Sequence, residues 1–459
     1  MAGIQYAGEF TLDKCDLITA SGGKVDIKAL VVEVNIFEDI YRSGMTGTVG
    51  FMDTNNVFSK GHVRGQDYIV LKISTPTLSE NSNIYIDQTF TVNKVEAKFK
   101  AGVKAEFVQL HFVSNEVLKN VRHRISKAYE DTPTKIIENI FRDEKIIASK
   151  KPLYIEHSTG VKRVIFPSVR PFDAIKQMLL ESVSSKNNSP HYFFFENSEG
   201  YHCRTLQNML DQPTVADFNH GDDDAVVGGT TKLFNVEEDL KKLITFEVNR
   251  SIDMLINTAT GVLSSKLDEI NIFNKSFNEK VVNYFEDFLK HARIDENPIY
   301  SDAPIQRDGK TVGDFPNAKT FLHAVSEHDG QDKTHYNTNT ESYSFSPSEI
   351  GKSTFLDKQS KNKELFTMLK ATASANGNVT IGAGKCVNVR GVFSNLNETD
   401  MYDGKYLIIQ LRHQFDIGTK KHETIFTIVK DSLGEEVPKN GSIEYEEYES
   451  KNSGTFELE

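Results

Sequence analysis

Short segments in which apolar and polar residues alternate dominate the first quarter of the chain. The runs 68–73, 89–95 and 107–112 alternate with a period of two and are rich in β-branched and aromatic residues. Turn-forming residues bound each run, and the turn at 100–102 separates the last two. This pattern predicts antiparallel strands that bury one face and end in a hairpin.

The same pattern returns near the end of the chain, at 386–391, 405–411 and 424–429. The order of the predicted strands matches that of the first quarter. Two similar small β-barrels therefore explain the pattern most economically, and two unrelated antiparallel sheets are the alternative.

A repeat in the sequence supports the first interpretation. Residues 33–47 align at a constant offset, without a gap, to 247–261, and six of the fifteen positions are identical. Average residue usage gives about one identity by chance over such a length. We interpret the repeat as an internal duplication whose second copy is interrupted by a long insertion.

The region between the two copies has a mixed pattern. Thr132 is placed to cap a helix over 133–141, and a second helix begins at Pro171. The runs 192–196 and 201–204, separated by a four-residue turn, predict a hairpin. A mixed α/β domain is expected here.

The insertion begins with apolar residues spaced three and four apart, which predict a helix that ends before Pro298. These residues are Phe273, Phe277, Val281, Tyr284, Phe285, Phe288 and Leu289. The polar segment 300–360 predicts loops over another subunit or partner. A short helix with Leu365, Met368 and Leu369 is expected to lead back to the second barrel.

Composition narrows the class of protein. Charged residues make up 26% and hydrophobic residues 38%, and the first six residues lack the features of a secretory signal. No apolar run reaches the roughly 20 residues of a membrane-spanning helix. The net charge of −12 disfavours a general nucleic-acid binder. It also allows a wall that repels DNA phosphates, although solubility explains the charge equally well.

Candidate chemistry is sparse. Cys15, Cys203 and Cys386 are far apart and are interpreted as buried thiols, not as a disulfide or zinc set. The Gly351-Lys352-Ser353 triplet has Ser346 where a phosphate-binding loop needs glycine. His220 beside Asp222-Asp223-Asp224 lacks the spacing of a calcium loop, so a solvated turn is preferred.

The sequence also lacks the common motifs of hydrolases. It has no GxSxG or HExxH motif, and His111 and His413 fall on predicted strands, where a structural role is expected. We therefore assign no catalytic, cofactor-binding or metal-binding residues and no cofactor. A hydrolase or a nucleotide-dependent enzyme remains the alternative of a different class, and it predicts a compact cleft with perturbed carboxylates or a phosphate site.

Three stretches resemble the hub family of contractile tails, which includes myovirus baseplate hub proteins, late-control tail proteins and the N-terminal part of VgrG secretion spikes. The first runs from Pro167 through 171–175 to the hairpin ending at Tyr201. The second is 378–387, and the third is the closing hairpin formed by 404–413 and 426–431. Together with the duplication, the resemblance covers most of residues 30–435.

The resemblance implies an α+β, mainly β fold with two duplicated tube-type antiparallel β-barrel domains, a mixed α/β domain and a helical insertion. The expected domains are a first barrel (1–116), the mixed domain (117–206), a second barrel in two parts (207–270 and 376–438), the insertion (271–375) and an acidic C-terminal tail (439–459).

The family's function is structural, without enzymatic activity. The resemblance implies a trimeric baseplate hub in the virion, assembled in the host cytoplasm, with pseudo-sixfold symmetry. It implies partners in the tail tube, the baseplate wedge and a central spike, and a channel through which DNA passes without specific binding. Another tail-tube or secretion-apparatus component remains possible.

The resemblance also gives the spike and the subunit interface an expected place. Since the chain ends at 459, the spike is expected to be a separate polypeptide, and the acidic run 444–449 is a candidate contact with it or a solvated terminus. Strands are expected to continue between subunits with buried Phe and Val, so that an Asp at Val34 or Val248 abolishes ring assembly.

Overall fold

The computed structural model describes most of the chain. The described residues are 4–20, 22–54, 63, 65–76, 82–100, 105–220, 236–250, 252–271, 275–288, 290, 293–302, 309–325, 363, 365–366, 368–393 and 400–434. The candidate helix residues Phe273 and Leu289, the triplet 351–353, Asp222–Asp224 and the acidic run 444–449 lie outside these residues.

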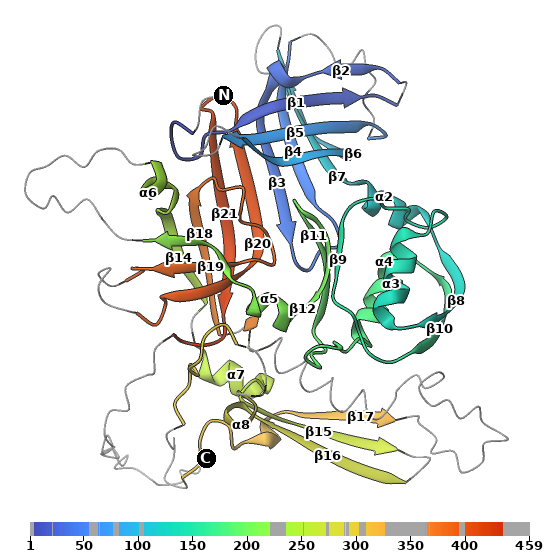
Figure 1. Ribbon diagram of the computed structural model, residues 1–459, viewed down its shortest axis with the longest axis vertical. Helices are drawn as coiled ribbons and strands as arrows, with labels where there is room; N and C mark the ends of the chain where they lie inside the picture. Colours follow the sequence, from blue (N-terminus) through green and yellow to red (C-terminus); the bar gives the residue numbers. More distant parts are fainter. Residues whose placement is uncertain are drawn as a thin grey trace, which may run out of the picture.

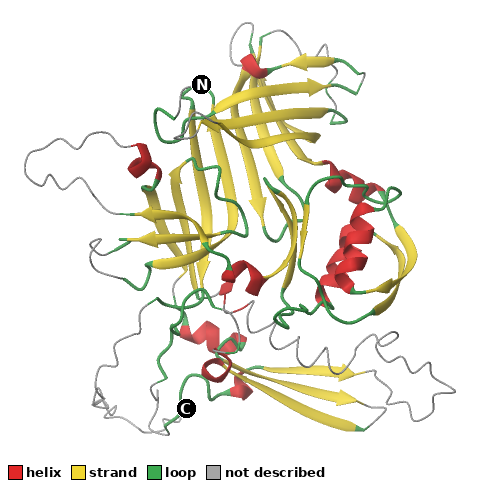
Figure 2. Cartoon of the chain, viewed as in Figure 1, coloured by secondary structure: helices red, strands yellow, loops and turns green. Residues whose placement is uncertain are grey.

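One large sheet of 13 strands forms the body of the molecule. Figures 1 and 2 show how its strands are arranged. Its N-terminal strands are β1 (Thr11–Ile18), β2 (Lys24–Asp26), β3 (Val31–Asp39), β4 (Thr46–Asp53), β5 (Tyr68–Pro76), β6 (Ser82–Lys100) and β7 (Glu106–Ser114), with a 3-10 turn at Lys28–Leu30. Its C-terminal strands are β13 (Thr214–Asn219), β14 (Leu243–Arg250), β18 (Leu369–Asn376), β19 (Cys386–Arg390), β20 (Gly404–Asp416) and β21 (Lys421–Lys430). The short helix α6 (Val236–Leu240) precedes β14.

The sheet consists of two units with the same strand order. The first sheet unit runs β3-β4-β7-β6-β5-β1, and the second runs β14-β18-β21-β20-β19-β13. Each strand of one unit has a counterpart in the other, so the expected order of strands in the two copies is confirmed. The units differ in the direction of their last strand. In the first unit β1 is antiparallel to its neighbour β5, whereas in the second unit β13 is parallel to its neighbour β19.

The ladders also show where the sequence alignment is displaced. A bulge lies between Val31 and Glu33 in β3, and the matching bulge in β14 lies between Leu243 and Thr245. Leu243 is therefore the structural counterpart of Val31, whereas the sequence repeat, extended by two positions, aligns Val31 with Thr245. A shift of two keeps every side chain on its own face of the sheet, so the alternation alone does not reveal it. The matched Thr-Gly pairs likewise differ, since Thr46 begins β4 whereas Thr260 ends a helix.

Each sheet unit curls around its own hydrophobic core. The first core gathers buried side chains from β1 and β3–β7, including Val34, Phe51 and Phe112. The second gathers those of β13, β14 and β18–β21, including Phe426 and Ile428. Alternation with a period of two produces this arrangement, because one face of each strand enters the core and the other faces outward.

The middle of the chain forms a separate α/β layer, seen beside the first unit in Figure 1. Its elements are α2 (Asn115–Arg122), β8 (Ile125–Asp131), α3 (Pro133–Arg142), β9 (Leu153–Ile155), β10 (Lys162–Val169), α4 (Pro171–Leu180), β11 (Tyr192–Asn197), β12 (Gly200–Thr205) and α5 (Leu206–Asp211). The two predicted helices and the predicted hairpin are therefore present, and α3 and α4 pack against each other in one core with Phe194 and Tyr201.

The insertion differs from its prediction. It contains α7 (Met254–Thr260), β15 (Ser264–Asn271), β16 (Ser276–Asn283), α8 (Tyr284–Phe288), a 3-10 turn at Pro316–Ala318 and β17 (Thr320–Val325). The helix expected over 273–289 is wrong for 276–283, which pair along their length with β15. The apolar spacing of three and four becomes helical only at Tyr284, because a neighbouring strand is available before that point.

Two further expectations in this region change. The segment 300–360, predicted as loops, contains β17, which lies parallel to β15. Leu369, expected in a helix, begins β18, while Leu365 and Met368 are buried. Together β15, β16 and β17 form a separate three-stranded sheet. None of the helices in the described part of the chain has both the length and the apolar character that crossing a membrane requires.

Candidate assembly surface

The two sheet units meet through a continuous antiparallel ladder between β20 and β3. Pairing runs from Gln410 opposite Asp39 to Asp416 opposite Glu33. Side chains reinforce it, because Arg412 donates from Nε to Asn35 Oδ1 at 3.0 Å and Gln410 donates to Asp39 at 3.1 Å. The chain thus contains one complete edge-to-edge junction between two copies of the same unit.

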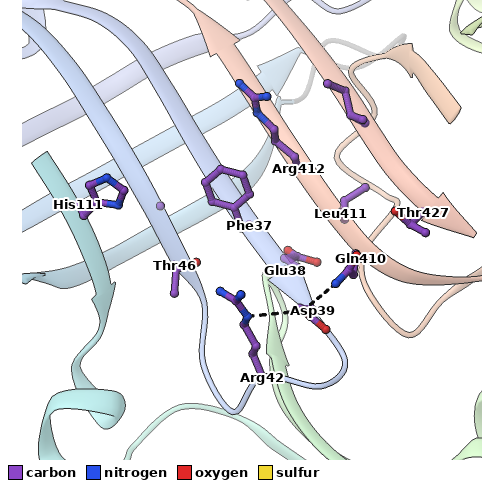
Figure 3. Close-up of a pocket in the computed structure, with 12 residues that line it drawn as sticks. Phe37, Glu38, Asp39, Arg42, Thr46, His111, Gln410, Leu411, Arg412 and Thr427 are labelled. Atoms are coloured by element: carbon purple, nitrogen blue, oxygen red, sulfur yellow. Dashed lines mark hydrogen bonds and ion pairs between the residues drawn. The ribbon is translucent and has the colours of Figure 1, made fainter. Parts of the chain in front are cut away.

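This junction is hollow on one face. A cavity of about 470 Å³ opens there, and residues of both units line it, as the close-up in Figure 3 shows. The Arg412 guanidinium lies over the ring of Phe37, with the Arg412 Cζ atom 5.9 Å from the ring centre. The sheet is therefore concave on this face where the units join.

The concave face is mostly polar along the run of strands from β14 to β6, although its outward positions also carry Met52, Phe99, Phe107, Val113 and Ile425. Residues on it share the outward positions of the alternation: Glu33, Asn35, Phe37, Thr46, Thr48, Lys94, Glu96, Gln109, His111, Glu247, Thr372, Ser374, Gln410, Arg412, Gln414, Asp416, Lys421, Glu423 and Thr427. Acidic and basic side chains are interspersed, and His111 contacts Glu96. We refer to this surface as the polar face.

A buried carboxylate joins three parts of the molecule on the opposite face. Glu38 of β3 is 1% exposed and accepts hydrogen bonds from the Tyr85 hydroxyl, the Ser198 backbone and the Ala383 backbone. These donors belong to the first unit, the β11–β12 turn and the second unit. Burial raises the pKa of Glu38 to about 7, although its three hydrogen bonds oppose the shift.

A second buried carboxylate fastens the first unit to the α/β layer. Glu196 accepts from the Met45 backbone at 2.9 Å and from the Ser114 hydroxyl at 2.5 Å. Lys151 contacts Glu196 at 2.5 Å and Glu116 at 3.1 Å. Since Glu196 is 1% exposed, its charge is satisfied entirely from within the protein.

The histidines expected to be structural lie as the pattern predicted, on strands. His111 is in β7, and His413 of β20 is fully buried beside His422, with 2.9 Å between His413 Nδ1 and His422 Nε2. Burial lowers the pKa of His413, with a further contribution from His422, and burial lowers that of His422 to about 3. Both rings are neutral at physiological pH and serve the core.

The cysteines also match their interpretation. Cys15, Cys203 and Cys386 are buried and unpaired. Burial raises the pKa of Cys15 to about 12 and that of Cys386 to about 11, so both remain thiols. Within the described residues, no three His, Cys, Asp or Glu side chains gather where they could hold a metal ion. Sequence reasoning missed Glu38 and Glu196, which only their buried surroundings distinguish from the other acidic residues.

Comparison with known proteins gives a match in structure alone. No family model matches the chain, and no curated protein sequence matches it. The tail protein from Neisseria meningitidis MC58 is 10% identical with a TM-score of 0.50, and the match covers 93% of this chain and 98% of that one. The 43 kDa tail protein of prophage MuSo2 from Shewanella oneidensis is 8% identical with a TM-score of 0.51, covering 91% and 98%.

Both matches extend over nearly the whole of each protein. The fold class expected from the sequence is confirmed, with two duplicated sheet units and a mixed α/β layer. The chain has the fold of these phage tail proteins, in agreement with its resemblance to the baseplate hub family.

Proposed function

We propose that this chain is the structural hub of a contractile phage tail, forming a trimeric ring with pseudo-sixfold symmetry. The observation that carries the proposal is the β20–β3 junction, where two copies of one unit already associate edge to edge. The fold shared with two phage tail proteins supports a role in a virion tail.

A ring follows from repeating this junction. Contact between different edges of identical units is heterologous, and it either closes into a ring or continues as a filament. Three chains supply six similar units, which suits a sixfold tail tube on one side. Because the junction is concave on its polar face, a closed ring places that face toward the centre.

The polar face suits a channel for DNA. Its short hydroxyl side chains are the half-buried Thr46 and Thr372 and the buried Thr48 and Ser374, and the charged residues among them carry both signs. The net charge of −12 is therefore not concentrated on this face. Weak contact with phosphates here comes from small polar groups and from interspersed charges of both signs, and not from a uniformly acidic wall.

The insertion supplies the threefold character that a spike requires. It lies between β14 and β18 of the second unit, whereas β3 and β4 of the first unit are joined directly by residues 40–45. Three copies of the insertion in a ring of six units reduce the symmetry on that side to threefold. We propose that a separate trimeric spike binds there, that wedge proteins bind outside the ring, and that the hub acts without catalysis or cofactor.

The first test is the mass of the purified chain in solution, together with negative-stain class averages. Three chains in a ring with a central opening are expected. A protein that stays monomeric at high concentration and with its spike added would contradict the hub. The partner that binds the ring distinguishes a phage tail from a secretion apparatus. Binding of a tail-tube protein of the same virus indicates a phage tail.

A further inference from the structure

Both ends of the eight-strand run β14-β18-β21-β20-β3-β4-β7-β6 have an edge that no described strand covers. In β6, residues 94–100 pair with β7 on one side, and β5 stops pairing at Thr91. In β14, the ladder to β18 occupies one side, and on the other side the described strand contact is a single bridge between Asn219 and Lys242, just before the strand begins. Figure 1 shows these strands on opposite sides of the body. An uncovered strand edge presents backbone donors and acceptors that favour pairing with another strand.

The internal duplication identifies the strand that fits each edge. β6 is the counterpart of β20, and β14 is the counterpart of β3. In β20, the edge that corresponds to 94–100 is the one that pairs with β3. The two uncovered edges are thus the counterparts of the two edges that already join inside the chain.

Bulges in the two units set the alignment of β6 with β20. β6 bulges between Val92 and Lys94, opposite Phe112 and His111, and β20 bulges between Ile408 and Gln410, opposite Ile428 and Thr427. β6 has a further bulge between Val95 and Ala97 that β20 lacks. Following the ladder along β7 and β21 past this bulge makes Phe99 the counterpart of Gln414, since Phe99 is opposite Phe107 and Gln414 is opposite Glu423.

The partner position follows in the same way. Inside the chain Gln414 pairs with Asn35, and the structural offset that matches Val31 to Leu243 makes Glu247 the counterpart of Asn35. We propose that β6 of one chain pairs antiparallel with β14 of a second copy, with Phe99 opposite Glu247 and Lys98 opposite Val248. This inference rests on the proposed ring and specifies its subunit interface residue by residue.

The chemistry of the two edges is compatible with this pairing. The end of β6 carries Lys94, Lys98 and Lys100 beside Glu96, whereas β14 carries Glu247 and Arg250 and follows the acidic helix α6 and Lys241-Lys242. Phe99 is 56% exposed and Ile244 is 43% exposed, which is a large apolar exposure for edge strands. Pairing covers both and brings Glu247 close to the lysines of β6.

Disulfide trapping tests the register in the full chain. The double variant F99C/E247C places thiols directly opposite each other between neighbouring chains, where Cβ atoms are about 4.5–5.5 Å apart. The two positions of one chain are separated by seven strand spacings, about 33 Å along the sheet, so a bond within a chain is not formed. Mild oxidation is expected to convert most of the trimer into covalently linked dimers and trimers on a non-reducing gel.

Two shifted pairs serve as controls. F99C/T245C and F99C/N249C keep the same face but move the partner by two residues, and F99C/N249C is the pair that the sequence repeat itself aligns. Both are expected to cross-link at least tenfold more slowly. Faster trapping of either control, or an intact trimer in which F99C/E247C does not cross-link, overturns the proposed register. Absence of a trimer in the unmodified chain instead contradicts the proposed ring, so the two failures are distinguishable.

Discussion

The two sheet units share a strand order but differ in what joins their first two strands. In the first unit, residues 40–45 connect β3 to β4, and in the second unit the whole insertion connects β14 to β18. The cores differ accordingly, because β3 is buried between β4 and β20 while β14 lies at an edge. The comparison teaches how a duplicated chain keeps one strand order while the connections between its strands, and therefore its surfaces, come to differ.

The largest expected effect comes from a charge placed at a buried position of the first unit, compared with its half-buried counterpart in the second unit. Val34 is fully buried opposite Phe415, whereas its structural counterpart Phe246 is half-buried in β14. V34D places an unpaired charge in the first core and is expected to cost about 4 kcal/mol or more of unfolding free energy. F246D is expected to cost about 1–2 kcal/mol. Urea denaturation of both variants measures the difference, and equal losses would contradict the assigned edge position of β14.

The burial of Val34 also corrects an expectation from the sequence. Val34 was predicted to lie at a subunit interface, but the structure places it in the core at the junction inside the chain. The expected effect of V34D is therefore loss of folding before any loss of assembly. For Val248, on half-buried β14, a place beside a neighbouring chain stays a prediction, in keeping with the proposed pairing.

A second comparison concerns how each unit is fastened to the elements around it. Lys151 holds Glu196 beside the first unit, and Lys430 contacts Asp295 of the insertion at 3.0 Å in the second. Removing either lysine leaves a carboxylate without its buried cation, which typically costs about 3–5 kcal/mol. K151A is expected to have the larger effect because Glu196 is 1% exposed, whereas the Asp295 side chain is 17% exposed. Thermal unfolding of the two variants gives the order, and a larger loss for K430A would reverse it.

Glu38 makes the joint between the units sensitive to pH. Its pKa is about 7 in the folded protein and 4.5 ordinarily, so between these values the folded state keeps a proton that the unfolded chain has lost. Its contribution to stability therefore falls as the pH rises from about 4.5 to 7 and is constant above, by an amount on the order of 3 kcal/mol.

E38Q tests this behaviour because it keeps an acceptor oxygen and cannot ionise. Urea midpoints of the variant and the unmodified protein are compared at pH 5 and pH 7.5. The variant is expected to gain relative stability at the higher pH. A constant difference at both pH values would show that Glu38 does not titrate in this range.

The smallest expected effect lies on the polar face of the junction. Arg412 is partly exposed and interacts with Asn35 and with Glu33 at 3.6 Å. R412A is expected to lower the unfolding free energy by about 0.5–1 kcal/mol, since exposed ion pairs contribute little. K421A on the same face provides the matched control. A loss well beyond that range for R412A would mean that side chains, more than the backbone ladder, hold the junction together.

The alternation of apolar and polar positions determined a great deal of this fold. It specified the strands β5–β7 and β19–β21, the helices α3 and α4 and the hairpin β11–β12, because local periodicity reflects burial of one face. The repeat revealed the duplication. These features depend on residues close together in the chain, which is why one sequence was sufficient to predict them.

Tertiary structure decided what depends on distant pairing. Residues 276–283 have apolar spacing typical of a helix, yet they form a strand because β15 lies beside them. The register of the repeat differs by two positions from the sequence alignment, because bulges and ladders fix it and side-chain alternation is unchanged by such a shift. Glu38 and Glu196 became recognisable only when segments far apart in the sequence enclosed them, since burial and hydrogen-bond partners are properties of the folded chain.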